Sequence, residues 1–181
     1  DRGISGASTI VLEYVLDTPS LNLRYGVSLI SVEQAKRNLE REINNYDLKV
    51  LSEAGRRIWN EKLGKISVTG GSEQDKTVFY TSLYRTYERM ICISEDGKYY
   101  SAFDGKVHND YGIPFYTDDW IWDTYRAVHP LRVIIEPKME TDMISSFIRM
   151  AEQMEQFWMP TFPEITGDTR RMNSNHGVAT V

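Results

Sequence analysis

Residues 27–43, VSLISVEQAKRNLEREI, contain the change of pattern that decides the fold class. Before Ser31 the chain has two β-branched, apolar runs, 9–16 and 21–30, which are separated by a turn-forming cluster. After Ser31, apolar residues recur every three or four positions, and Gln34 stands at the spacing of a capping box. The sequence therefore predicts two strands followed by an amphipathic helix. Two strands alone are marginal in water, so we expect the rest of their sheet to lie outside this chain.

Helical spacing continues over most of the remaining chain. Apolar stripes predict four further helices, at 48–64, 73–91, 118–128 and 140–156. Asp118 or Asp119 could cap the third of these, and His129-Pro130 marks a kink or boundary after it. The intervening residues 94–116 form a long loop, with a short strand at 98–103. This order favours an array of helical hairpins over a compact bundle.

The composition excludes several classes of function. The 181 residues are 41% hydrophobic and carry a formal charge of −5, with no basic stripe, so nucleic acid is a poor partner. No apolar run reaches the roughly 18 residues of a membrane span. The single Cys92 excludes an internal disulfide, and the three dispersed histidines do not form a ligand-spaced motif.

Residues 116–126, YTDDWIWDTYR, concentrate carboxylates and aromatic rings. Asp119 and Asp123 are four apart, so on one helix their Cβ atoms would lie about 5 to 6 Å from each other. Paired carboxylates of this kind hydrolyse glycosides, although Asp118 and Asp119 could equally be helix caps. Trp120 is interpreted as a core residue.

Asp123 has two possible roles. It could form a structural ion pair with Arg126, three residues later. Alternatively, its carboxylate could accept hydrogen bonds from sugar hydroxyls while Trp122 stacks on the sugar ring.

A second candidate lies at 159–177, where an aromatic-bearing loop leads to a helix whose first turn holds His176. This histidine could be an acid/base, a ligand to substrate hydroxyls, or a buried structural residue. The loop carboxylates Glu164 and Asp168 have no visible partner in the sequence.

An ordered series of motifs resembles glycoside hydrolase family 92, a family of α-mannosidases. Its members in chain order are GVSLISVEQA (26–35), FYTSLY (79–84), GKY (97–99), FDG (103–105), YT (116–117), WDTYRA (122–127) and HPL (129–131). The similarity covers about residues 26–181 in register. The stretches DDWI at 118–121 and NSNHG at 173–177 depart from the family pattern.

The resemblance implies a secreted or periplasmic exo-acting α-mannosidase that depends on calcium and inverts the anomeric carbon. It also implies a fragment of a β-sandwich followed by the first helices of an (α/α)6 barrel. On that scheme residues 1–30 end the sandwich, 31–65 form linker helices and 66–181 begin the barrel. We expect an internal fragment whose partners are mannose-containing glycans and the remainder of its own polypeptide.

The resemblance also implies a set of substrate-binding residues, Trp122, Asp123, Arg126 and His176. Asp123 matches the family position that binds hydroxyls of the terminal mannose, and Arg126 is expected to orient it. The general acid, the general base and the calcium ligands are expected in following segments, so the isolated chain should be inactive. Two alternatives stay open: another (α/α)6 glycosidase such as a trehalase-like enzyme, or a noncatalytic carbohydrate-binding module.

Overall fold

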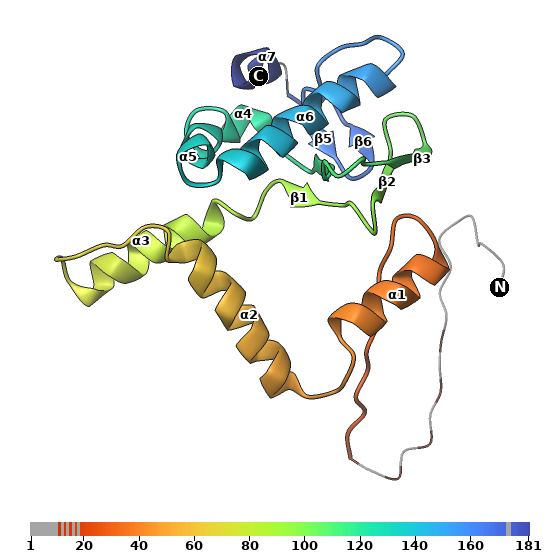
Figure 1. Ribbon diagram of the computed structural model, residues 1–181, viewed down its shortest axis with the longest axis vertical. Coiled ribbons are helices and arrows are strands. Elements are labelled where there is room, and N and C mark those ends of the chain that lie inside the picture. The colour runs from red at the N-terminus through yellow and green to blue at the C-terminus, as the bar shows by residue number, and fades with distance from the viewer. Residues whose placement is uncertain (1–10, 12, 14, 16, 18, 173–174) are drawn as a thin grey trace.

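The computed structural model describes residues 11, 13, 15, 17, 19–172 and 175–181. Within this part the fold is mostly helical, with three two-stranded antiparallel sheets. Figure 1 shows an extended arm of three helices, α1 (Val32–Glu42), α2 (Leu48–Leu63) and α3 (Glu73–Arg85). A compact unit holds β1 (Ile91–Cys92), β2 (Lys98–Ser101), β3 (Lys106–Asn109), β4 (Tyr116–Thr117), α4 (Ile121–Thr124), α5 (Val128–Ile135), α6 (Pro137–Gln153), β5 (Pro163–Glu164), β6 (Gly167–Asp168) and α7 (His176–Thr180). None of the described helices is long and apolar enough to cross a membrane.

Ser31 caps helix α1 as predicted, but the helix buries polar side chains where its apolar stripe was expected to be buried. Ser31 Oγ accepts a hydrogen bond from the amide of Gln34 at 3.1 Å. The buried residues are the polar Gln34 and Asn38, whereas Val32 is 69% exposed. Gln34 Nε2 donates to Asp96 at 2.7 Å and Asn38 Nδ2 donates to Glu95 at 2.6 Å. Hydrogen bonds to the turn before β2 therefore decide the orientation of α1.

The strand predicted at 21–30 is wrong, because these residues pack against α1 and do not pair with another strand. Asn38 Nδ2 donates to the carbonyl of Val27 at 3.0 Å. Gly26 approaches α1 so closely that a Cβ there would lie 2.2 Å from the carbonyl oxygen of Ala35. The strand predicted at 9–16 lies largely outside the described residues.

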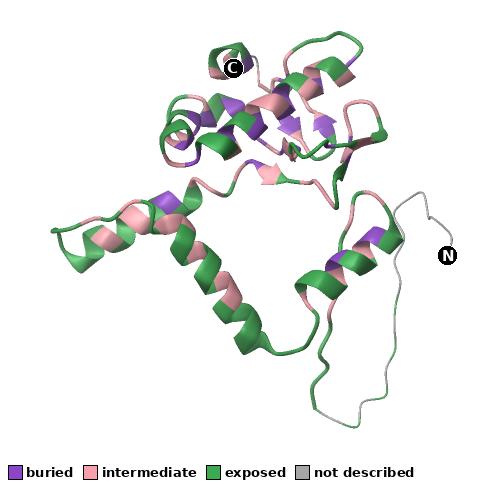
Figure 2. Ribbon diagram, in the orientation of Figure 1, coloured by how far each residue is buried: buried purple, intermediate pink, exposed green. Residues whose placement is uncertain are grey.

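The arm also contacts the compact unit at the end of α2 and beyond α3. The α2 helix has the predicted bounds, with Asp47 as its N-cap, yet it buries no residue fully, and Ile58 is 59% exposed. Figure 2 shows that burial is concentrated in the compact unit, while α2 is mainly exposed. Lys62 and Lys65 of this arm each bind Glu136 at 2.8 Å.

The α3 helix ends at Arg85, earlier than the predicted end near residue 91. The buried guanidinium of Arg132 donates hydrogen bonds to the carbonyls of Thr86 and Arg89. The chain then enters β1, where Ile91 pairs with Thr117 of β4. Tertiary contacts thus replace the last predicted helical turn.

The buried core confirms the apolar stripe predicted for α6, although the helix runs over Pro137–Gln153 and not over 140–156. Met143, Phe147 and Met150 form its buried stripe. They pack with Tyr99 and Phe115, whose rings stack with centroids 4.1 Å apart. The predicted short strand at 98–103 is present as β2, which pairs with β3 and orders most of the long loop.

The single helix predicted at 118–128 is instead broken into α4 and α5. Neither Asp118 nor Asp119 caps α4, because Trp120 occupies the N-cap without a side-chain hydrogen bond. Pro130 lies in the first turn of α5, where its missing N–H breaks no helical hydrogen bond. His129-Pro130 is therefore inside α5 and does not form a boundary.

Candidate functional site

The α4 helix presents Trp122 and Asp123 at the surface of the compact unit. Ile121 and Thr124 are the buried residues of this short helix. Trp122 is 45% exposed, and Asp123 is exposed as well. The Asp123 side chain has no hydrogen-bond or ion-pair partner among the described residues, so its carboxylate is available to a ligand.

Arg126 and His176 are brought together through Tyr125. The Tyr125 ring stacks on the His176 ring with centroids 4.2 Å apart and planes 9° apart. Arg126 Nε donates to the Tyr125 hydroxyl at 2.8 Å. The expected contact between Arg126 and Asp123 is not formed, because the guanidinium binds this hydroxyl instead. Sequence reasoning did not single out Tyr125, whose role depends on contact between segments about 50 residues apart.

A buried polar network fixes the base of α4. Asp119 is fully buried, and its Oδ2 atom accepts hydrogen bonds from Thr124 Oγ1 at 2.9 Å and His129 Nε2 at 3.1 Å. The Nδ1 atom of His129 lies 2.7 Å from Glu140 of α6. Asp119 therefore links α4 to α5 and does not share a helical face with Asp123. The predicted pair of carboxylates on one helix is wrong.

The charge of this network is balanced by two buried cations. Burial opposes protonation of His129, but the hydrogen bonds to Asp119 and Glu140 outweigh it and raise the pKa of His129 to about 9. Burial lowers the pKa of Arg132, and the carboxylates of Glu140 and Asp119 oppose that change. His129 is only 3% exposed, which makes it a structural residue here and not a base that could reach a ligand.

The β5–β6 hairpin covers the other side of the same segment. The amide of Asp119 donates to the carbonyl of Pro163 at 3.0 Å. Trp120, which we interpreted as a core residue, is 40% exposed, and its ring stacks near Phe162 with centroids 5.8 Å apart. Arg89 lies over the Trp120 ring at 3.9 Å and binds Asp118 at 2.5 Å.

The two loop carboxylates both have partners. Asp168 accepts hydrogen bonds from the amides of Thr161 and Phe162 at 3.0 and 2.9 Å. Glu164 forms an ion pair with Arg171 at 3.3 Å. These contacts assign the two carboxylates to the structure of the loop.

The described side chains do not gather into a set of acidic ligands typical of a calcium site. The described side chains include no group of three or more histidine, cysteine, aspartate or glutamate residues that could hold a metal ion. In the loop around β3, Asp104 binds His108 at 2.9 Å and Asp110 accepts a hydrogen bond from the amide of Gly112 at 2.8 Å. Both carboxylates are thus used within the loop.

Comparison with known proteins identifies what the chain is similar to. A family model described as the glycosyl hydrolase family 92 catalytic domain matches residues 34–181. The inverting mannosidase BT2199 of family GH92 from Bacteroides thetaiotaomicron is 34% identical with a TM-score of 0.75, over 84% of this chain and 21% of that one. The α-mannosidase BT3965 from the same organism is 25% identical with a TM-score of 0.78, over 84% and 20%.

A curated fungal protein, an uncharacterized secreted glycosidase from Arthroderma benhamiae, is 34% identical over 70 residues, which are 36% of this chain and 9% of that protein. The chain therefore spans about a fifth of the length of the solved mannosidases that it matches.

Proposed function

Because the chain belongs to glycosyl hydrolase family 92, we propose that the complete polypeptide releases terminal α-linked mannose from glycans with inversion at the anomeric carbon. The similarity to BT2199, an inverting mannosidase, supports the reaction and its stereochemistry. A structure of BT3965 in complex with mannoimidazole, 26% identical to this chain, supports a mannose-like ligand. Family membership also favours this proposal over a trehalase-like enzyme.

The observation that carries the proposal is the exposed pair Trp122 and Asp123 on a rigid base. An indole face can stack on the apolar C–H face of a sugar, while a carboxylate accepts hydrogen bonds from its hydroxyls. Asp119 and Thr124 anchor α4 from below, so little conformational freedom is lost when a sugar binds. Asp123 would thus bind hydroxyls of the terminal mannose beside Trp122.

Arg126 and His176 form the other edge of this proposed mannose-binding site. Tyr125 holds both, by a hydrogen bond on one side and a ring stack on the other. Their donors would bind further hydroxyls of the glycan. Arg126 would therefore contact the substrate directly and would not orient Asp123.

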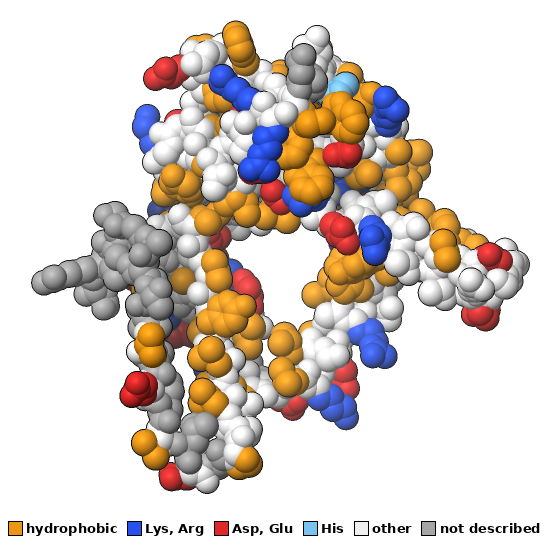
Figure 3. Space-filling model, turned by 180° about the vertical axis from the view of Figure 1, so that it is seen from behind, with side chains coloured by type: hydrophobic (Ala, Val, Ile, Leu, Met, Phe, Trp, Pro, Cys, Tyr) orange, Lys and Arg blue, Asp and Glu red, His pale blue; other side chains and the backbone are white. Residues whose placement is uncertain are grey.

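The exposed apolar side chains of the arm support the proposal that this chain is part of a larger folded protein. Figure 3 shows hydrophobic side chains around an opening between the arm and the compact unit. Val27, Leu48 and Ile58 are all more than half exposed. Apolar surface that gathers in one place, as it does around this opening, marks a face that packs against further protein. We assign residues 1–30 to the end of a β-sandwich, 31–65 to linker helices and 66–181 to the start of an (α/α)6 barrel. The remainder of the polypeptide would cover these faces.

The proton-transfer groups and any calcium ligands would lie elsewhere in the complete polypeptide. Within the described residues, Asp119 serves the buried network, Asp118 pairs with Arg89, and Asp168 serves the β5–β6 loop. The isolated chain would then bind mannosides without turnover. We also propose a secreted or periplasmic location, which the name of the fungal relative supports.

Proton NMR of an aryl α-mannoside incubated with the complete polypeptide tests the proposed reaction. Initial release of β-mannose is the expected result, since inversion converts the α-linkage into a β-hemiacetal. A matched incubation with chelator tests the calcium dependence, and aryl α-glucoside serves as the substrate control. Binding of mannan without release of mannose would contradict the proposal and favour a noncatalytic binding module.

A further inference from the structure

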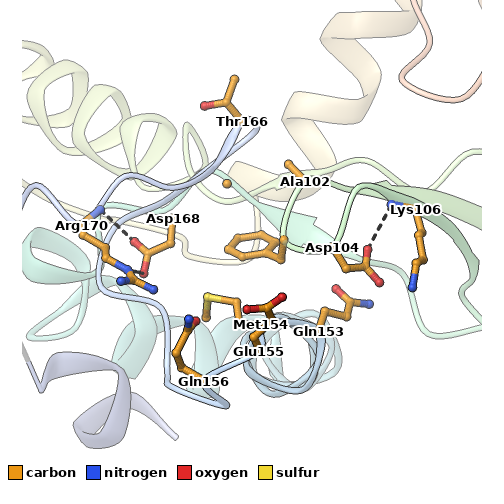
Figure 4. A pocket seen from close by; sticks show the side chains of 12 residues that line it. Ala102, Asp104, Lys106, Gln153, Met154, Glu155, Gln156, Thr166, Asp168 and Arg170 are labelled. Carbon is orange, nitrogen blue, oxygen red and sulfur yellow. Dashed lines mark hydrogen bonds and ion pairs between the residues drawn. The ribbon is translucent and has the colours of Figure 1, made fainter.

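A polar cavity of about 690 Å³ shares no residue with the α4 face. Figure 4 shows that its lining comes from three directions. The contributors are Asp104 and Lys106 of the β2–β3 hairpin, Gln153 and Gln156 at the end of α6, and Asp168 and Arg170 around β6. A volume of this size is typical of small-ligand sites, which commonly measure about 300–1,000 Å³.

The walls of the cavity are fixed by hydrogen bonds behind its surface. Gln153 accepts from Ser101 Oγ at 2.7 Å and donates to the Tyr99 hydroxyl at 2.8 Å. Gly167 has a φ of +115°, and a Cβ there would lie 3.4 Å from the carbonyl oxygen of Ala102. L side chains rarely adopt this φ, so glycine allows the backbone conformation at the start of β6, which lies against Ala102 at the wall of the cavity.

Other lining groups have no such partners. The side chains of Glu155 and Gln156, and the ammonium group of Lys106, make no hydrogen bond to the described residues, whereas Figure 4 shows the Thr166 side chain turned away from the cavity. They supply both donors and acceptors at the edge of a preformed cavity. A ligand that carries several hydroxyl groups could satisfy them together.

The charge and the aromatic surface of the cavity favour a neutral sugar. Three carboxylates line it against the two cations Lys106 and Arg170, so a phosphate or another anion would meet net repulsion. The half-buried Phe103 supplies an apolar surface. Beside the cavity, Trp158 is 64% exposed, with the Arg170 guanidinium 5.9 Å from its ring centroid. Aromatic faces next to free polar groups suit the C–H faces and hydroxyls of a hexose.

We propose that this cavity is an accessory subsite for a further sugar residue of the glycan, separate from Trp122 and Asp123. The inference rests on the proposed function for the nature of the ligand. The β5–β6 hairpin connects the two places, because it lines the cavity and also accepts the hydrogen bond from Asp119 through Pro163. A glycan long enough to span from one place to the other would engage both.

Methyl NMR of the complete polypeptide, labelled with ¹³C-methyl methionine, tests this subsite. Met154 lines the cavity, whereas Met143 lies in the core and is an internal reference. The probe is an S-linked mannotriose, which glycosidases do not cleave. The Met154 signal should shift on titration, and the Met143 signal should stay in place.

Substitutions identify the binding groups. Gln156→Ala and Arg170→Ala should each weaken the apparent affinity about threefold to tenfold, the cost of one lost hydrogen bond. Arg171→Ala is the matched control, because Arg171 does not line the cavity and pairs with Glu164. A stationary Met154 signal, or equal weakening by all three substitutions, would overturn the proposal.

The NMR titration and the hydrolysis assay distinguish failure of the accessory subsite from failure of the proposed function. Hydrolysis of an aryl α-mannoside by the unsubstituted protein, without a Met154 shift, overturns the subsite alone. A Met154 shift without hydrolysis supports the subsite and contradicts the mannosidase activity.

Discussion

The carboxylate of Asp119 accepts a hydrogen bond from His129 Nε2 at 3.1 Å, and both side chains are buried. Because Asp119 precedes α4 and His129 belongs to α5, this contact fixes the bend between the two short helices. The Nδ1 atom of His129 meets Glu140, which ties the same bend to α6. The exposed residues of α4 are therefore held by a charged network beneath them.

Replacing His129 should strongly destabilise the protein. His129→Leu leaves Asp119 and Glu140 buried without their shared cation, and breaking such a network costs about 3–5 kcal/mol. His108→Leu is the matched control, because its hydrogen bond with Asp104 is partly exposed and should contribute about 1 kcal/mol or less. Urea denaturation measures both losses, and equal losses would contradict the assigned role of the network.

The network should also make stability fall at alkaline pH. The pKa of His129 is raised from 6.5 to about 9 in the folded protein, so folding favours the protonated form. The resulting stabilisation is fully present below pH 6.5 and is lost as the pH rises toward and through about 9. The urea midpoint should therefore fall over this range in the unsubstituted protein. A His129→Gln variant should lack this component, and identical pH profiles for the two proteins would refute it.

Two glycines of the arm should respond to alanine in opposite directions. A Cβ at Gly26 would lie 2.2 Å from the carbonyl oxygen of Ala35, so Gly26→Ala should force the segment off α1 and cost about 1–3 kcal/mol. Gly55, inside α2, has nothing within 4 Å of the same position. Gly55→Ala should therefore stabilise the protein by about 0.5–1 kcal/mol through helix propensity. Thermal denaturation of both variants checks the opposite signs.

The elements that sequence reasoning predicted correctly depend on local chemistry. The predicted cap Ser31 accepts a hydrogen bond from the amide of Gln34, three residues later. The methionine-rich stripe of α6 follows directly from helical spacing, and Met143 and Met150 are buried as that spacing requires. Such contacts lie within one or two turns of helix, so a single sequence contains all the information that they need.

The elements that were wrong depend on distant partners. The apolar run at 21–30 has strand-like composition, but a strand also needs a neighbour, and α1 takes that place. The break between α4 and α5 follows from burial of Asp119 against His129 and Glu140, which helical periodicity does not register.

The candidate site was predicted in part. The motif around Trp122 and Asp123 identified the exposed face of α4. The stack of Tyr125 on His176 joins segments that lie far apart in the chain, so only the structure shows it. The same holds for the cavity, whose lining comes from two hairpins and a helix end.

The most direct test of the central claim is the kcat/KM of Asp123→Asn in the complete polypeptide, measured with an aryl α-mannoside. Loss of a charged hydrogen bond of about 1.5–3 kcal/mol should lower kcat/KM roughly 10- to 150-fold. Glu152→Gln, an exposed carboxylate on α6 outside both proposed sites, is the matched control and should retain full activity. Unchanged kinetics in Asp123→Asn would contradict the assignment of this face as the mannose-binding site.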